Sequence, residues 1–165
     1  MKIGIMSDTH ISKKVSKLDG IMESCFGDID LLIHAGDYKD IEVVEYLKKS
    51  KDFIGVYGNV DCNSIKSLLN EREIISIEGY RIGIYHGHGK KGTTIERSYN
   101  QFIDDNVDII IFGHSHQPIV KTMKKTLMLN PGSLINKRRE RWFSYIILNI
   151  KRNNFNVEIN FFDDL

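Results

Sequence analysis

Histidine, aspartate and asparagine side chains recur in five short segments whose residue types suit the binding of divalent metal ions. These segments are Ser7–His10, His34–Asp37, Gly58–Asp61, His86–His88 and Gly113–His116. Imidazole nitrogens and carboxylate or amide oxygens are the ligands that divalent metals accept in proteins, and one carboxylate can bridge two ions. The sequence therefore predicts a metal centre, provided that the fold brings the five segments together.

The elements that must position these side chains are five apolar runs, each ending where one of the segments begins. They are Lys2–Met6, Leu31–His34, Phe53–Tyr57, Arg81–Tyr85 and Ile109–Phe112. Short apolar runs bounded by glycine and polar residues are typical of buried strands. Ligands of α/β sheets bind outside the carboxyl ends of such strands. We expect Asp-x-His and His-x-His to be extended there, so that both side chains face the same way.

Helical patterns lie between the early runs, and further strands fill the last part of the chain. We expect helices over Lys14–Phe26, over Asp40–Lys49 with Asp40 as N-cap, and over Thr93–Phe102 with Thr93 near its start. This alternation favours parallel pairing in the first half. Consecutive antiparallel strands are expected at Ile119–Met123, Leu127–Leu129, Trp142–Ile150 and Phe155–Phe162. The predicted fold is α/β, with two mixed β-sheets packed as a sandwich and flanked by helices, in a single domain over residues 1–165.

Composition sets the broad class of the protein. The chain has 165 residues, 41% hydrophobic and 27% charged, with a formal net charge of +1. This balance is typical of a globular domain and gives no general attraction to nucleic acid or acidic membranes. The two cysteines, Cys25 and Cys62, match no disulfide or metal framework, and no run has the length of a membrane helix. We expect a cytoplasmic protein.

Taken in order, the five segments resemble a known family. Asp8-x-His10, Gly36-Asp37, Gly58-Asn59-x-Asp61, His86-Gly87-His88 and Gly113-His114-x-His116 are similar to the five motifs of the calcineurin-like metallophosphoesterase superfamily. The chain length and Asn130-Pro131-Gly132-Ser133 after the last motif resemble its small single-domain phosphodiesterase branch from bacteria and archaea. The resemblance runs from Met1 to about Ile150, and five motifs in order are far more specific than any one of them.

The resemblance implies a function and a ligand set. It implies hydrolysis of a small-molecule phosphodiester by a hydroxide that bridges two divalent ions, with Mn first among the metals and Ni, Co, Fe or Zn as alternatives. The first ion would be bound by Asp8, His10 and His116, and the second by Asn59, His86 and His114, with Asp37 bridging both. Asn59 would also contact the substrate. Related small enzymes often form homodimers.

One position departs from many members of the superfamily. Phosphomonoesterases and nucleases of this kind commonly carry histidine directly after the motif asparagine, whereas this chain has Val60, which cannot transfer a proton. His88 is therefore our candidate for protonating the leaving group or contacting the substrate. Two alternatives stay open. One is a phosphomonoesterase or nuclease of the same superfamily, and the other is a non-catalytic protein-interaction scaffold with the same fold.

Other residues near the motifs have simpler interpretations. We expect His34 to be a hydrogen-bonded core histidine, Asp61 to support the ligands or cap a helix, and Cys62 to be a small buried filler. Asn130–Ser133 is expected to form a turn beside the site. The basic stretches Lys90-Lys91 and Lys137–Arg141 are expected on the solvated surface, where either could meet substrate phosphates.

Overall fold

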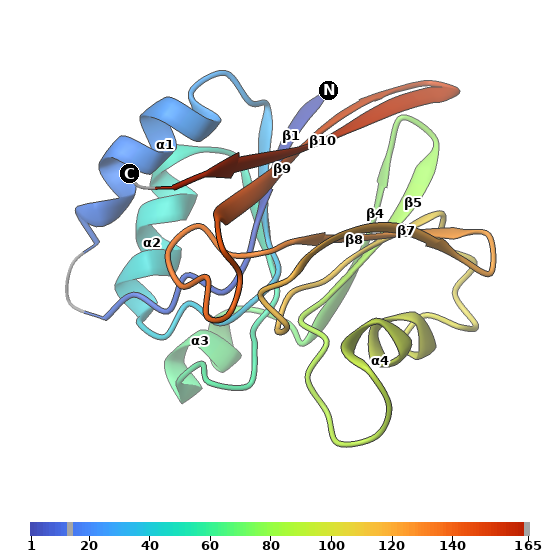
Figure 1. Cartoon of the computed structure of the whole chain (residues 1–165), viewed down its shortest axis with the longest axis horizontal. Helices are drawn as coiled ribbons and strands as arrows, with labels where there is room; N and C mark the ends of the chain where they lie inside the picture. The colour runs from blue at the N-terminus through green and yellow to red at the C-terminus, as the bar shows by residue number, and fades with distance from the viewer. Residues whose placement is uncertain (13–14, 164–165) are drawn as a thin grey trace.

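Two five-stranded β-sheets pack face to face and carry helices on their outer sides (Figure 1). This computed structural model describes residues 1–12 and 15–163. The first sheet has the strand order β10-β9-β1-β2-β3, and the second has the order β4-β5-β6-β8-β7. The expected α/β sandwich of two mixed sheets is confirmed.

The first sheet contains both ends of the described chain. Its strands are β1 (Lys2–Met6), β2 (Leu31–His34), β3 (Phe53–Gly55), β9 (Phe143–Lys151) and β10 (Asn154–Phe162). Strands β1, β2 and β3 pair in parallel, as the alternation of strand and helix predicted. Strand β9 pairs antiparallel with both β1 and β10, so the chain returns to the centre of the sheet in which it began.

The second sheet differs from expectation in two ways. Its strands are β4 (Arg72–Ile77), β5 (Tyr80–Tyr85), β6 (Ile109–Ile111), β7 (Pro118–Met123) and β8 (Thr126–Pro131). Strand β4 was not predicted, because it is a half-buried edge strand without a continuous apolar run. Strand β8 pairs antiparallel with β7, as predicted, but parallel with β6 on its other side.

The helices in the described residues are α1 (Lys17–Phe26), α2 (Ile41–Ser50), α3 (Asn63–Leu68) and α4 (Thr94–Asn100). Of these, α1, α2 and α4 begin close to their predicted starts. Asp40 caps α2 by accepting from the N–H of Glu42, and Thr93 forms a capping box with Glu96. The predicted first residue of α1, Lys14, lies outside the described residues, and α3 was too short to foresee. No helix of the described part of the chain could span a membrane.

Alternation along the strands divides the core into three apolar layers. Ile3 and Ile5 of β1 face the second sheet, where they join Ile109 and Ile111 of β6. On the outer side of β1, Met6 packs with α1 and α2, and on the outer side of β6, Ile110 packs with Phe102, just beyond α4. These layers fix both sheets against each other, so the loops after β1, β2, β5 and β6 meet at one edge of the sandwich.

Candidate metal centre

Six of the seven predicted ligands form two compact groups at this edge. In each group, the atoms that could bind a metal all lie within 4.8 Å of one another. The first group is Asp8, His10 and His116, and the second is Asp37, His86 and His114. This division matches the one that the resemblance implies for two ions, apart from Asn59.

The two groups adjoin each other through Asp37. Its Oδ2 atom lies 3.2 Å from Nε2 of His86 in its own group and 3.7 Å from Nε2 of His10 in the other. The same His10 nitrogen lies 3.7 Å from Oδ1 of Asp8. Asp37 therefore stands between the groups, which is the place that a bridging carboxylate would occupy.

Each of the two aspartates has one oxygen bonded to the protein and one that is not. Oδ2 of Asp8 accepts from the hydroxyl of Ser7 at 2.7 Å and the N–H of His114 at 2.9 Å, and Oδ1 of Asp37 accepts from the N–H of Val60 at 3.1 Å. Among the described residues, Asp8 Oδ1 and Asp37 Oδ2 are buried without a hydrogen-bond donor. An unpaired buried charge is costly, so these oxygens fit a cation between the groups.

The histidines present unprotonated nitrogens to the same space. Nδ1 of His86 donates to the carbonyl of Ala35 at 2.7 Å, and Nδ1 of His116 donates to the carbonyl of Asn136. These bonds fix the tautomers and leave both Nε2 atoms with free lone pairs. Nε2 of His116 lies 3.2 Å from Nε2 of His10, a contact between nitrogens that a shared metal ion would relieve.

Electrostatics holds Asp8 and His114 in the forms that can bind a metal ion. Burial raises the pKa of Asp8, but the imidazoles of His10 and His116 beside its carboxylate outweigh this effect and bring the pKa far below its usual value. Burial lowers the pKa of His114 to about 4, with help from the charge of His86. Burial also lowers the pKa of His86, but the carboxylate of Asp37, 3.2 Å away, outweighs this effect and raises the pKa. At neutral pH, Asp8 is thus ionised and His114 is neutral, as ligation requires.

The predicted extended geometry of the motifs is wrong. The backbone φ angles are positive at Asp8 (55°), His10 (48°), Asp37 (63°), His114 (68°) and His116 (59°). Such left-handed residues cost on the order of 1–2 kcal/mol each and concentrate at functional sites. The strands have ended before these residues, so tight turns set the side-chain directions. For this reason His114 and His116 join different groups, which an extended segment would not allow.

Asp61 holds the loop that carries Asp37. Its Oδ2 accepts from the N–H groups of Asp37 at 3.0 Å and Gly58 at 2.7 Å, and its Oδ1 accepts from the N–H of Lys39 at 2.8 Å. The predicted supporting role is confirmed, whereas the alternative of a helix cap is not, because Cys62 occupies that position on α3. Gly58 is also required, since a Cβ there would lie 2.0 Å from Oδ1 of Asp37.

Asn59 and Val60 lie in an exposed turn at the rim of the groups. The N–H of Gly58 on one side of the turn bonds to Asp61, and the N–H of Val60 bonds to Asp37. These bonds hold the turn that carries Asn59 close to Asp37, and the role of Asn59 as a ligand stays a prediction. The side chain of Val60 is 44% exposed, so solvent or substrate can reach the position that lacks a proton donor.

His88 lies outside both groups. Its ring centroid is 5.8 Å from that of His86, and its Nε2 is 3.3 Å from Oε1 of Glu71. Within the described chain, its Nδ1 is buried without a hydrogen-bond partner. Its role as proton donor or substrate contact stays a prediction. Glu71 escaped the sequence analysis because it belongs to no motif and lies just before the unforeseen strand β4.

Three further residues or segments near the site can be compared with expectation. His34 is the expected core histidine, because its Nδ1 accepts from the N–H of Gly36 at 3.1 Å and its ring stacks on Tyr38. Cys62 is exposed, so the prediction of a buried filler is wrong: the cysteine precedes a short surface helix. The Asn130–Ser133 segment adjoins the site, because Ser133 donates to the carbonyl of Asp8 at 2.8 Å, but the prediction of a turn is wrong for Asn130 and Pro131, which end strand β8.

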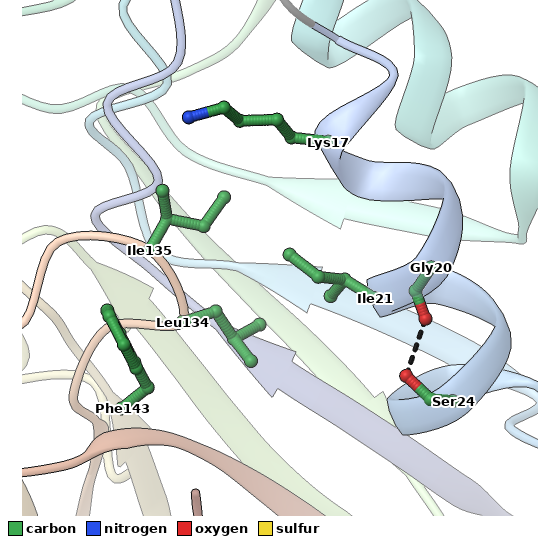
Figure 2. A pocket seen from close by; sticks show the side chains of 7 residues that line it. All are labelled: Lys17, Gly20, Ile21, Ser24, Leu134, Ile135 and Phe143. Carbon is green, nitrogen blue, oxygen red and sulfur yellow. Dashed lines mark hydrogen bonds between the residues drawn. The ribbon is translucent and has the colours of Figure 1, made fainter. Parts of the chain in front are cut away.

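Hollows surround the strand ends on several sides. The β8–β9 loop and α1 enclose a largely apolar one of about 440 Å³ (Figure 2). Its lining residues are Lys17, Gly20, Ile21, Ser24, Leu134, Ile135 and Phe143. None of these seven residues belongs to the two ligand groups, so this hollow is not where metal chemistry would occur. Lys17 and Ile135 also line a smaller hollow of about 160 Å³ that reaches His10.

Known proteins share both sequence and fold with this chain. A family model described as the calcineurin-like phosphoesterase superfamily domain matches residues 1–153. A probable metallophosphoesterase from Methanocaldococcus jannaschii is 34% identical over 81% of this chain and 68% of its own length. A phosphodiesterase from the same organism is 30% identical, over 80% of this chain and 83% of its own. The structure of Vps29 complexed with Zn²⁺ from Entamoeba histolytica matches with a TM-score of 0.72 at 23% identity, covering 99% of each chain.

Proposed function

Because this chain belongs to the calcineurin-like phosphoesterase superfamily and is a metal-dependent phosphoester hydrolase, we propose that it is a phosphodiesterase that uses two divalent metal ions. The observation that carries the proposal is the pair of unpaired, buried oxygens on Asp8 and Asp37, which face the imidazole nitrogens of two adjoining groups. A relative named a phosphodiesterase supports the choice of diesters.

The chemistry of the donors suggests how two ions would be held. Asp8, His10 and His116 would bind the first ion, His86, His114 and Asn59 the second, and Asp37 would bridge them. Nitrogen and oxygen ligands without thiolate suit Mn, our first choice, and also Ni, Co, Fe or Zn. The bonds from His86 to Ala35 and from His116 to Asn136 would keep the imidazoles oriented when no metal is bound.

Bound ions of this kind lower the pKa of a water molecule towards neutrality and neutralise charge on the phosphoryl oxygens. The protein supplies position and access. Asn59 lies at the exposed rim, where its amide can donate to a phosphoryl oxygen. Asp61 fixes the loop of Asp37, so that the bridging carboxylate stays in place during turnover.

The choice of diester over monoester rests on Val60. A leaving group that needs a proton finds only an alkyl side chain at this exposed position, and His88 is our candidate for an alternative donor. We therefore propose that diesters with good leaving groups are cleaved best, ahead of phosphomonoesters or long nucleic acids. The scaffold alternative has one point in its favour, the shared fold with Vps29. We favour catalysis because six of the seven expected ligands lie together in the two groups.

The test compares hydrolysis of bis-p-nitrophenyl phosphate and p-nitrophenyl phosphate by metal-stripped protein resupplied with Mn, Ni, Co, Zn or Mg. We expect metal-restored cleavage of the diester with little cleavage of the monoester. Asp37→Ala should abolish activity while keeping the fold. Asp40→Ala, which removes a nearby helix cap, should leave the activity in place. Preferred monoester cleavage would make the protein a phosphatase, and two bound ions without any activity would favour the scaffold.

A further inference from the structure

A basic pocket lies beside the ligand groups, between the loop that joins β6 to β7 and the loop that joins β8 to β9. It has a volume of about 610 Å³ and is lined by Ser115, Gln117, Arg138, Arg139 and Glu140. We refer to these five residues as the arginine pocket. The overall charge of the chain is only +1, so this pocket is a local feature that the composition does not reveal.

Two connections join the arginine pocket to the proposed metal centre. Ser115 stands in the chain between His114 and His116, which belong to different ligand groups. On the other side of the pocket, Nη1 of Arg138 donates to the carbonyl of His114 at 3.3 Å. A molecule bound at the metal centre and extending past Ser115 would therefore enter the pocket directly.

The pocket keeps two guanidinium groups available. Arg138 and Arg139 are exposed, and neither forms an ion pair with a carboxylate in the described part of the chain. The other cations of this stretch point elsewhere, because Lys137 lies over the ring of Phe143 and Arg141 over the ring of Trp142. The planar fork of a guanidinium matches the oxygens of a phosphate group.

The remaining lining residues fit a phosphate in part. The Oγ of Ser115 accepts from the side chain of Asn130 at 3.0 Å and from the N–H of Gln117 at 3.3 Å. Its own proton has no acceptor among the described residues and is free to bind a phosphate oxygen. The carboxylate of Glu140 repels an anion, so it would weaken phosphate binding. Removing its charge should therefore strengthen phosphate binding, whereas removing the charge of an arginine should weaken it.

We propose that the arginine pocket binds a second, terminal phosphate group of the substrate. The substrate would be a small phosphodiester that also carries a phosphomonoester, with the diester at the metal centre and the terminal phosphate between Arg138 and Arg139. This inference rests on the proposed function and adds to it a substrate class. Only binding is proposed for the second phosphate, so it leaves the pocket intact after the diester bond breaks.

The test uses two chromogenic diesters that differ only in the second phosphate. These are thymidine 5′-(p-nitrophenyl phosphate) and its 3′-phosphorylated form, which share the scissile bond and the leaving group. With Mn-loaded protein we expect kcat/KM to be about tenfold higher for the 3′-phosphorylated form, the low end of what a hydrogen bond to a charged group supplies. The ratio of the two kcat/KM values is the quantity to follow.

Three variants on the β8–β9 loop distinguish direct contact with the second phosphate from a general effect of the charge of the protein. Arg139→Gln should reduce the ratio to near one, and Glu140→Gln should raise it by removing the opposing carboxylate. Arg141→Gln changes the charge as Arg139→Gln does, but its side chain lies on Trp142 and does not line the pocket, so the ratio should not change. An equal fall in both arginine variants would overturn the proposal, because it would show only long-range attraction.

A binding measurement separates this inference from the proposed function. Calorimetry should show tighter binding of thymidine 3′,5′-bisphosphate than of thymidine 5′-monophosphate, and Arg139→Gln should remove the difference. Such binding without cleavage of either diester would support the pocket and reject the phosphodiesterase. Cleavage of both diesters at equal rates would support the phosphodiesterase and reject the pocket. Internal cutting of oligothymidylate with the same dependence on Arg139 would replace the small substrate with a nucleic acid.

Discussion

Replacing Asp61 tests whether one buried carboxylate holds the loop that carries the bridging Asp37. Asp61 is 4% exposed and accepts three N–H groups, two at Oδ2 and one at Oδ1. Asp61→Asn can keep its amide oxygen where two of these bonds are made, but it presents an N–H₂ group to Lys39. Asp61→Ala loses all three bonds and leaves the N–H groups of Asp37 and Gly58 without their acceptor.

The magnitudes follow from the number of bonds lost. A hydrogen bond to a charged group contributes about 1.5–3 kcal/mol, so Asp61→Asn should lower the free energy of unfolding by about 2 kcal/mol. The three bonds of one residue are not additive, and we expect about 4 kcal/mol for Asp61→Ala. For a chain of this size, each kcal/mol lowers Tm by roughly 2–4 °C. Mn binding should also weaken about tenfold in Asp61→Asn, because the loop of Asp37 is loosened.

Urea unfolding of the metal-free protein gives the free energies, and calorimetry with Mn gives the affinities. Asp40→Ala is the matched control, because it removes a neighbouring acid that caps α2 through one N–H at 3.4 Å. That cap contributes about 1 kcal/mol, with no expected effect on Mn binding. If Asp61→Ala costs no more than Asp40→Ala, or if Mn binding is unchanged, the supporting role of Asp61 is refuted.

Three further predictions concern the core histidine, the metal centre and the missing proton donor. Burial lowers the pKa of His34 to about 3. As pH falls from about 6.5 towards 3, this histidine therefore takes up a proton only in the unfolded chain. The free energy of unfolding then drops by at most about 1.4 kcal/mol per pH unit. Urea midpoints of the metal-free protein should depend less on pH in His34→Gln, and an unchanged slope would contradict this. Mn at a hundred times its Kd should add about 2.7 kcal/mol to the free energy of unfolding, and Asp37→Ala should lose most of that gain, as thermal melts with and without chelator can show. Val60→His should raise kcat/KM for phenyl phosphate relative to p-nitrophenyl phosphate, because the position is 44% exposed and gains a proton donor, and phenolate is the poorer leaving group; an unchanged ratio would contradict the role of Val60.

The sequence predicted the fold where the local signal was strong. The apolar runs that became β1, β2 and β6 are continuous and buried, and Asp40 and Thr93 marked the starts of α2 and α4. Strand β4 and helix α3 were missed, because one is a partly buried edge strand and the other has only 6 residues. Their positions depend on neighbours rather than on their own pattern of apolar residues.

The ligand types and their places after the strands could be predicted from the sequence alone. The reason is that the carboxyl ends of parallel strands lie at a common edge of the sheet. Residue spacing did not divide those side chains into two groups: the family resemblance implied the division, and the tertiary structure shows its physical basis. That division depends on left-handed turns at residues such as Asp37 and His114, and on two sheets packed so that the N–H of His114 reaches Asp8. The arginine pocket likewise arises where the β8–β9 loop lies against Ser115, a contact between distant segments that no local pattern encodes.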